Sequence, residues 1–195
     1  MANLDQAPSR TMPNLLHVLP AFANESEHRV NTIVELNSNT INKYELITET
    51  GHLKLDRVGY SSLAYPFAYG CLPRTWDEDG DPLDIEIVNV TEPLVPGSIV
   101  EARIIGIMTF DDGGEVDDKV IGVIADDKRM DHIKSFEQLG KHWIKETTYY
   151  WEHYKDLKKP GTCTVNGFFG VEKAVEIIKS CEKRYLSEID PNLIN

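Results

Sequence analysis

Residues 31–123 carry apolar and polar positions in the pattern of a β-rich segment. Short runs of β-branched residues are separated by turns rich in Gly, Pro or Asp. The longest run exceeds one flat strand, and Gly106 within it indicates a bend or bulge. Short strands at such even spacing are typical of a small closed or nearly closed barrel. The expected strands are residues 32–36, 43–48, 53–56, 85–90, 98–110 and 120–124.

The hydrophobic period changes after about residue 131. In residues 141–157 the apolar and aromatic positions recur at steps of three and four, and residues 171–186 show the same spacing. This spacing places the apolar side chains on one face of an α-helix. We expect Pro160 and Gly161 to stop the first helix, and residues 158–169 to connect the two helices.

The chain of 195 residues is long enough for one domain, and it contains no visible internal repeat or linker. Residues 1–28 are polar and interrupted by Pro, and they predict an N-terminal arm or a first turn of helix. Residues 29–195 then form a single domain. Its predicted fold class is α+β, a β-barrel flanked by two main helices.

The formal net charge of −12 argues against polyanionic partners. Such a surface repels nucleic acid and anionic membranes, and no apolar run approaches the roughly 20 residues that cross a bilayer. Cys71, Cys163 and Cys181 are odd in number and lack Cys-x-x-Cys spacing, which fits the reduced thiols of a cytoplasmic protein. The six histidines show no His-Glu-x-x-His pattern, so no zinc site is expected.

An acidic stretch, TWDEDGDPLDIEIV (residues 75–88), concentrates negative charge just before a predicted strand. A calcium-binding EF-hand does not fit, because counting from Asp77 puts Pro82 where that loop needs Gly and Val88 where it needs Glu. A solvated turn is one explanation, and a site for hard cations is another. The clustered carboxylates are Asp77, Glu78, Asp79, Asp81 and Asp84.

A second acidic stretch, DDGGEVDDK (residues 111–119), surrounds a Gly-Gly turn between two predicted strands. A charged hairpin tip explains it without any ligand. If both stretches met at one end of a barrel, they would instead form a site for several metal ions. Mg²⁺ completes its coordination shell with waters and substrate phosphate oxygens, so a phosphate ligand is expected.

A phosphate ligand also needs cationic partners. The aromatic segment 58–70 reads as a loop suited to lining a cleft, and Tyr69 in it has a hydroxyl that could donate to a phosphate oxygen. Arg57 directly precedes that segment. The candidate cations are Lys43, Arg57, Lys119, Lys128, Arg129 and Lys155.

Five motifs, taken in order, resemble those of the soluble, family I inorganic pyrophosphatases. DGDPLD (79–84) is similar to the family signature Asp-x-Asp-Pro-x-Asp, and DDGGEVDDK (111–119) to Asp-x-Gly-Glu-x-Asp-x-Lys. NKYEL (42–46) resembles the Lys-Tyr-Glu motif. LDRVGYSSLAYPFAYG (55–70) resembles Asp-Arg followed by Tyr-Pro-x-x-Tyr-Gly, and EHYKDLK (152–158) the Tyr-Lys motif. The resemblance spans about residues 35–185.

The resemblance implies an OB-like five-stranded barrel and hydrolysis of inorganic pyrophosphate to two phosphates. It implies several Mg²⁺ ions per active site, with Mn²⁺ as a possible substitute. Asp81 resembles the carboxylate that activates the metal-bridged attacking water, and Asp117 is the rival for this role. The implied metal ligands are Glu35, Asp79, Asp84, Asp112 and Asp117. The implied phosphate-binding residues are Lys43, Arg57, Tyr69, Lys119, Tyr154 and Lys155.

The chain departs from the family pattern in places. Residues 35–43 form a segment one residue shorter than in common bacterial members, Ala68 stands where those have Asn, and the N-terminal arm is longer. GCLPRTWDE (70–78) resembles eukaryotic members instead. The resemblance implies a homo-oligomer. The short chain favours the hexamer of bacterial members, and the dimer of eukaryotic members remains possible.

Three other functions remain open from the sequence. An OB-barrel that binds single-stranded nucleic acid would need a basic groove with stacking aromatics, whereas this chain has acidic loops. A cation-binding module would bind Mg²⁺ without turnover. A broader phosphohydrolase acting on nucleotides is not supported by any Walker-type Gly-rich loop. Activity on pyrophosphate compared with ATP separates these functions.

Overall fold

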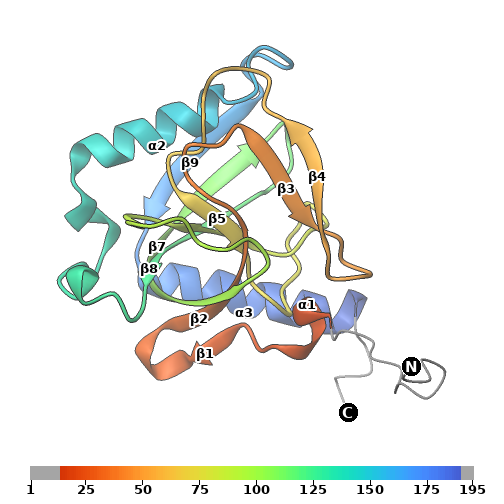
Figure 1. Ribbon diagram of the computed structural model, residues 1–195, viewed down its shortest axis with the longest axis vertical. Coiled ribbons are helices and arrows are strands. Elements are labelled where there is room, and N and C mark those ends of the chain that lie inside the picture. The colour runs from red at the N-terminus through yellow and green to blue at the C-terminus, as the bar shows by residue number, and fades with distance from the viewer. Residues whose placement is uncertain (1–13, 190–195) are drawn as a thin grey trace, which may run out of the picture.

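The computed structural model describes residues 14–189, and a closed ring of five strands forms its centre (Figure 1). Neighbouring strands in the ring are antiparallel, except that β6 and β8 run parallel. The predicted α+β fold with an OB-like five-stranded barrel is confirmed. In ring order the strands are β2 (Arg29–Leu36), β5 (Ala68–Cys71), β6 (Asp84–Ile87), β8 (Lys119–Ile124) and β7 (Ile99–Asp112), which pairs back with β2.

Within residues 14–189, four further strands lie beside the ring. β1 (Phe22–Asn24) pairs with β2, and β9 (Cys163–Phe169) pairs with β7. β3 (Asn42–Leu46) and β4 (Leu53–Val58) form a separate two-stranded sheet beside the ring (Figure 1). β1 and the short helix α1 (Leu15–Val18) belong to the segment predicted as an N-terminal arm. Residues 1–13 of that segment lie outside the described residues.

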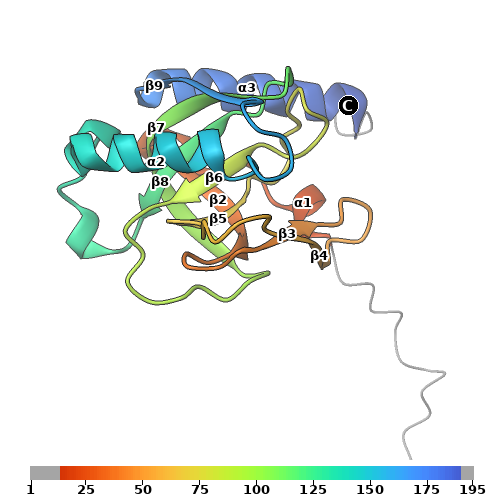
Figure 2. The ribbon, with the colours of Figure 1, turned by 90° about the horizontal axis from the view of Figure 1, so that it is seen from above.

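The helices α2 (Lys141–His153) and α3 (Val171–Glu188) flank the barrel, as predicted (Figure 2). Tyr150 and Trp151 of α2 pack into one core cluster, and Ala174 and Ile178 of α3 pack into another. No helix within residues 14–189 is both long and apolar enough to cross a membrane. The short 3₁₀ helices are η2 (Glu25–Glu27), η3 (Lys128–Met130) and η4 (Phe136–Leu139).

Three details differ from the sequence-based expectation. α2 ends at His153, well before Pro160, so residues 154–158 form turns after the helix. β5 begins within the segment expected to be a loop, residues 58–70. Its four residues are all buried, so they show no polar alternation that would predict a strand. β9 lies within the expected helix connection, where it extends the sheet along β7.

Gly106 bends β7, as predicted, since the register with β8 shifts between Ile104 and Gly106. A Cβ atom on this residue would lie 2.7 Å from the carbonyl oxygen of Phe169 and 2.8 Å from Cδ1 of Phe136. Glycine therefore allows β9 and η4 to approach the strand closely. The irregularity lies between residues 99–103, which pair with β2, and residues 107–112, which pair with β9.

We predict that Gly106→Ala destabilises the protein by about 1–3 kcal/mol, the usual cost of forcing extra volume into a packed site. Urea unfolding monitored by circular dichroism measures this loss, with an unchanged m-value showing that the unfolding transition stays cooperative. A loss below about 0.5 kcal/mol, the range of ordinary surface substitutions, would show that Phe136 and β9 yield to the methyl group.

Candidate active site

The parallel pairing of β6 and β8 brings the two acidic stretches together. Asp84 is the first residue of β6, Lys119 is the first residue of β8, and the two are register partners. Since parallel neighbours begin at the same edge of a sheet, the segments that precede them end side by side. The two stretches therefore meet at one edge of the barrel, as the metal-site interpretation requires.

A polar cavity lies at this edge. Asp79, Asp81 and Asp84 enter it from the first acidic stretch, and Asp117 enters from the second. Glu35 of β2 and Lys43 of β3 line it as well. Four of the five expected metal ligands thus share one cavity with the expected base Asp81 and one expected phosphate-binding lysine. The rest of its wall consists of Glu45, Leu46, Cys71 and Pro82.

Lys119 is a buried cation that pairs with two of the cavity carboxylates and does not itself line the cavity. It is 1% exposed, its Nζ lies 2.7 Å from Oδ2 of Asp84, and it also pairs with Oδ1 of Asp117. Burial opposes its charge, but Asp117 and then Asp84 outweigh that effect and raise the pKa of Lys119 above its usual value. The ammonium group therefore stays charged. It also lies 5.0 Å from the centre of the Trp151 ring, within cation–π range.

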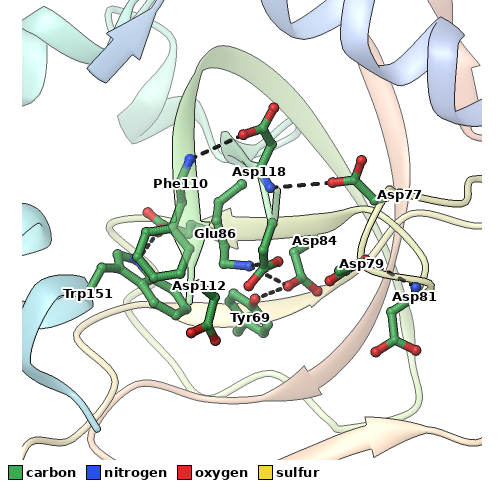
Figure 3. A network of polar contacts seen from close by, with 12 residues as sticks. Tyr69, Asp77, Asp79, Asp81, Asp84, Glu86, Phe110, Asp112, Asp118 and Trp151 are labelled. Atoms are coloured by element: carbon green, nitrogen blue, oxygen red, sulfur yellow. Dashed lines mark hydrogen bonds and ion pairs between the residues drawn. The ribbon is translucent and has the colours of Figure 1, made fainter. Parts of the chain in front are cut away.

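Tyr69 supports Asp84 from the barrel wall. Its hydroxyl donates a hydrogen bond to Oδ2 of Asp84 (Figure 3). Lys119 contacts the same oxygen. Burial, and then the charge of Asp84, raise the pKa of Tyr69 well above its usual value. Tyr69 therefore remains a neutral donor.

Burial and like-charge repulsion raise the pKa values of three other cavity carboxylates. Burial, followed by repulsion from neighbouring carboxylates, raises the pKa of Asp79 to about 8 and that of Asp81 to about 6. Burial, and then Asp84, raise the pKa of Glu35 to about 8. Oxygen donors crowded in this way are the ligand set that hard divalent cations take. The residues therefore fit Mg²⁺ in chemical kind.

The carboxylates do not already enclose a cation position. Within residues 14–189, no three His, Cys, Asp or Glu side chains are arranged closely enough to hold a metal ion. The Lys119 ammonium bridges Asp84 and Asp117 instead.

A second pocket holds most of the other expected residues. Arg57, Asp112, Tyr154 and Lys155 line it. The Tyr154 hydroxyl donates to Oδ2 of Asp112 over 3.0 Å, and Lys155 pairs with Oδ1 of the same carboxylate. Tyr60, Lys158 and Lys159 complete its lining.

The β3–β4 hairpin connects the two pockets. Lys43, in the first pocket, is the register partner of Arg57 in the second. The Arg57 guanidinium lies 4.0 Å from Oε1 of Glu45, which lines the first pocket and pairs with Lys43. Lys128 and Arg129, also candidates from the sequence, lie on η3 and line neither pocket.

Several site residues were not predicted. Glu45 stands two residues after Lys43 in a strand and thus on the same face, a spacing that could have revealed it. Lys158 and Lys159 lie three and four residues after Lys155, beyond Asp156 and Leu157. Glu86 stands two residues after Asp84 in β6 and carried the same spacing signal.

Glu86 is a buried carboxylate behind Lys119. It accepts a hydrogen bond of 2.6 Å from Nε1 of Trp151, while its other oxygen has no hydrogen-bond partner among the described residues (Figure 3). Burial raises the pKa of Glu86 to about 8, although Trp151 and Lys119 act in the opposite direction. The bond ties α2 to β6, and so links the helix before Tyr154 and Lys155 to the strand of Asp84.

Comparison with known proteins identifies the family. Residues 32–186 match the family model described as inorganic pyrophosphatase. The chain is 42% identical over 156 residues to the inorganic pyrophosphatase of Geobacillus stearothermophilus, a match covering 80% of this chain and 93% of that protein. The chain belongs to the inorganic pyrophosphatase family. The resemblance seen in the motifs is confirmed.

Other members of the pyrophosphatase family are similar in sequence and in structure. Soluble inorganic pyrophosphatase 3 of Arabidopsis thaliana is 43% identical over 149 residues, 76% of this chain and 68% of that protein. The crystal structure of an inorganic pyrophosphatase from Neisseria gonorrhoeae superposes with a TM-score of 0.83 at 37% identity, covering 88% of this chain and 98% of that chain. Family membership makes the chain a metal-dependent enzyme that hydrolyses pyrophosphate.

The raised carboxyl pKa values predict how pH affects stability when metal is absent. Glu35 and Glu86 rise from 4.5, and Asp79 from 3.8, to about 8. The folded protein therefore binds more protons than the unfolded chain between about pH 4 and 8, so stability should fall as pH rises through this window. Thermal unfolding with a chelator at about pH 5, 6.5 and 8 measures the trend.

Mg²⁺ should raise the unfolding midpoint most at pH 8, because the cation binds the ionised carboxylates. Asp79→Asn should reduce the pH dependence seen with chelator. A midpoint that does not change with pH in chelator, or one that Mg²⁺ raises equally at pH 5 and 8, would contradict the prediction.

Proposed function

We propose that the two pockets form one active site, in which Asp81 activates the water that attacks pyrophosphate. The observation that carries the proposal is the meeting of two acidic stretches beside Lys43 and Arg57 at one edge of the barrel. Such a site offers oxygen ligands to cations and cationic side chains to a phosphate, which is the combination a metal–pyrophosphate complex needs.

The proposed metal ligands lie in both pockets. Glu35, Asp79, Asp84 and Asp117 would hold Mg²⁺ ions in the first cavity, and Asp112 would hold one near the second. When bound, the ions supply an acidified water and neutralise charge on the phosphoryl oxygens. Mn²⁺, which also accepts carboxylate ligands, would be a substitute.

The substrate-binding groups approach from three sides. Lys43 and Arg57 come from the β3–β4 hairpin, and Tyr154 and Lys155 come from the turn after α2. Tyr69 and Lys119 stand behind Asp84 and would donate to a phosphoryl oxygen beside it. These donors bind and orient the two phosphoryl groups and stabilise the charge that develops as the bridging bond breaks.

The surroundings of the two candidate bases favour Asp81. Burial, and then the repulsion from Asp84, place the pKa of Asp81 at about 6, close to the neutral pH at which a general base works best. Asp117 is instead paired with the charged Lys119. We therefore assign proton acceptance to Asp81 and metal binding to Asp117.

The proposal extends to assembly and location. We propose a homo-oligomer, with the hexamer favoured over the dimer, acting in the cytoplasm. Cys71, Cys163 and Cys181 are free and buried, which is usual in a reducing compartment. Light scattering coupled to size-exclusion chromatography distinguishes the two assemblies by mass.

Phosphate release from pyrophosphate tests the proposed site. Release should require Mg²⁺, stop in excess chelator and fall by about 10²–10⁴-fold in Asp81→Asn, the usual cost of losing a general base. Asp126→Asn, the same change on a carboxylate outside both pockets, should leave the rate unchanged. Near-normal turnover in Asp81→Asn would remove Asp81 from its role. Comparable release from ATP would indicate a broader phosphohydrolase.

Arg57→Ala tests the connection between the pockets. Removing the guanidinium should raise the Michaelis constant and lower turnover together, with a combined loss in kcat/KM of about 10²-fold, because a charge-assisted contact to phosphate is lost that strengthens in the transition state. Arg129→Ala serves as the control, since Arg129 pairs with Asp127 away from both pockets. If the kinetic constants of Arg57→Ala match those of the control, Arg57 lies outside the working site.

A further inference from the structure

The five clustered carboxylates between Asp77 and Asp84 face two ways. Asp79, Asp81 and Asp84 line the cavity, whereas Asp77 and Glu78 do not. In Figure 3 Asp77 points toward Asp118, and the carboxylate of Asp81 points away from it. The proposed active site uses the three carboxylates of this group that line the cavity. The contacts of Asp77 and Glu78 are a separate question.

Arg184 of α3 contacts the part of the stretch that faces away from the cavity. Its Nη1 donates to the carbonyl oxygen of Trp76 over 2.8 Å, and its Nη2 donates to Oε1 of Glu78 over 3.0 Å. Nη1 also lies 3.6 Å from Oδ1 of Asp77. One guanidinium therefore contacts three consecutive residues of what we call the acidic loop, residues 76–82. Arg184 is 21% exposed and Asp77 only 6%, so their pairing is less screened than a surface ion pair.

Cys181 of α3 makes two further contacts with the acidic loop. The backbone N–H of Trp76 donates to the carbonyl oxygen of Cys181 over 3.1 Å, and the Cys181 thiol donates to Oδ1 of Asp77 over 3.5 Å. Cys181 and Arg184 are three positions apart and thus neighbours on one face of the helix. The end of the loop nearest α3 is therefore held by both side chain and backbone.

Asp77 also connects the acidic loop to residues of the cavity. Its N–H donates to the carbonyl oxygen of Asp81 over 2.7 Å, which closes the loop on itself. Its Oδ2 accepts the N–H of Asp118 over 3.3 Å, next to Asp117. A shift of Asp77 would therefore move Asp81 on one side and Asp117 on the other.

We propose that Arg184 is a positioning residue that holds the acidic loop through Asp77 and so sets the affinity of the cavity for divalent cations. The proposal rests on the function proposed above. Without the Arg184 guanidinium, Asp77 and Glu78 would add two negative charges with no cationic partner to a loop whose other carboxylates already repel one another. The loop would then spread, and the spacing of Asp79 and Asp81 that a cation needs would be lost.

Mn²⁺ binding by the full chain, measured by calorimetry without substrate, tests the proposal. Arg184→Gln should weaken Mn²⁺ binding by about tenfold, the lower end of the usual cost of losing a group that orients metal ligands. The Mg²⁺ concentration for half-maximal phosphate release should rise by the same factor, whereas turnover at saturating Mg²⁺ should stay within about threefold of the wild type. Lys183→Gln makes the same change of charge at the next, exposed position and should change neither quantity.

A folded Arg184→Gln with wild-type Mn²⁺ affinity would overturn the proposal, and so would an equal weakening in Lys183→Gln. Asp77→Asn removes the other end of the pair and carries the same test if Arg184→Gln does not fold. Combining the two substitutions should cost less than the sum of the single effects, because both act on one contact. A wild-type protein that binds Mn²⁺ but releases no phosphate would contradict the proposed function, while the affinities of the variants would still decide this inference.

Discussion

The buried ion pair between Lys119 and the carboxylates of Asp84 and Asp117 organises this molecule. A fully buried ammonium group is costly unless it is paired, and the partners must come from outside its own strand to surround it. Asp84 supplies one partner through the parallel pairing of β6 and β8, and Tyr69 holds that carboxylate from β5. The barrel register and the charge balance of the site therefore depend on each other.

The same pair explains why a site rich in carboxylates can exist before any cation arrives. Lys119 compensates Asp84 and Asp117, and burial keeps much of the charge of Glu35 and Asp79 suppressed by raising their pKa values to about 8. Divalent cations would replace both forms of compensation, so metal binding and proton release are linked. Glu86 and Trp151 lie behind this arrangement and connect it to α2.

Much of the site could be predicted because its residues stand at the ends of recognisable strands. Asp79, Asp81 and Asp84 precede a strand pattern, and Lys43 lies within one. The parallel pairing of β6 with β8 was not readable, since it joins strands that are not consecutive in the chain. The sequence also did not show that Asp77 and Glu78 face away from the cavity, because their contacts are with Arg184, more than 100 positions away. β5 escaped prediction because a fully buried short strand shows no polar alternation.

The pairing of β2 with β7 has a consequence for how the chain folds. Residues 29–33 pair with residues 99–103, so the ring closes only between segments far apart in the sequence. Such contacts cost loop entropy before they contribute stability, and proteins dominated by them fold slowly. A nascent chain that ends before β7 and β8 contains the acidic loop but lacks the strands that complete its surroundings. The enzyme's chemistry is therefore assembled late, after nearly the whole barrel has left the ribosome.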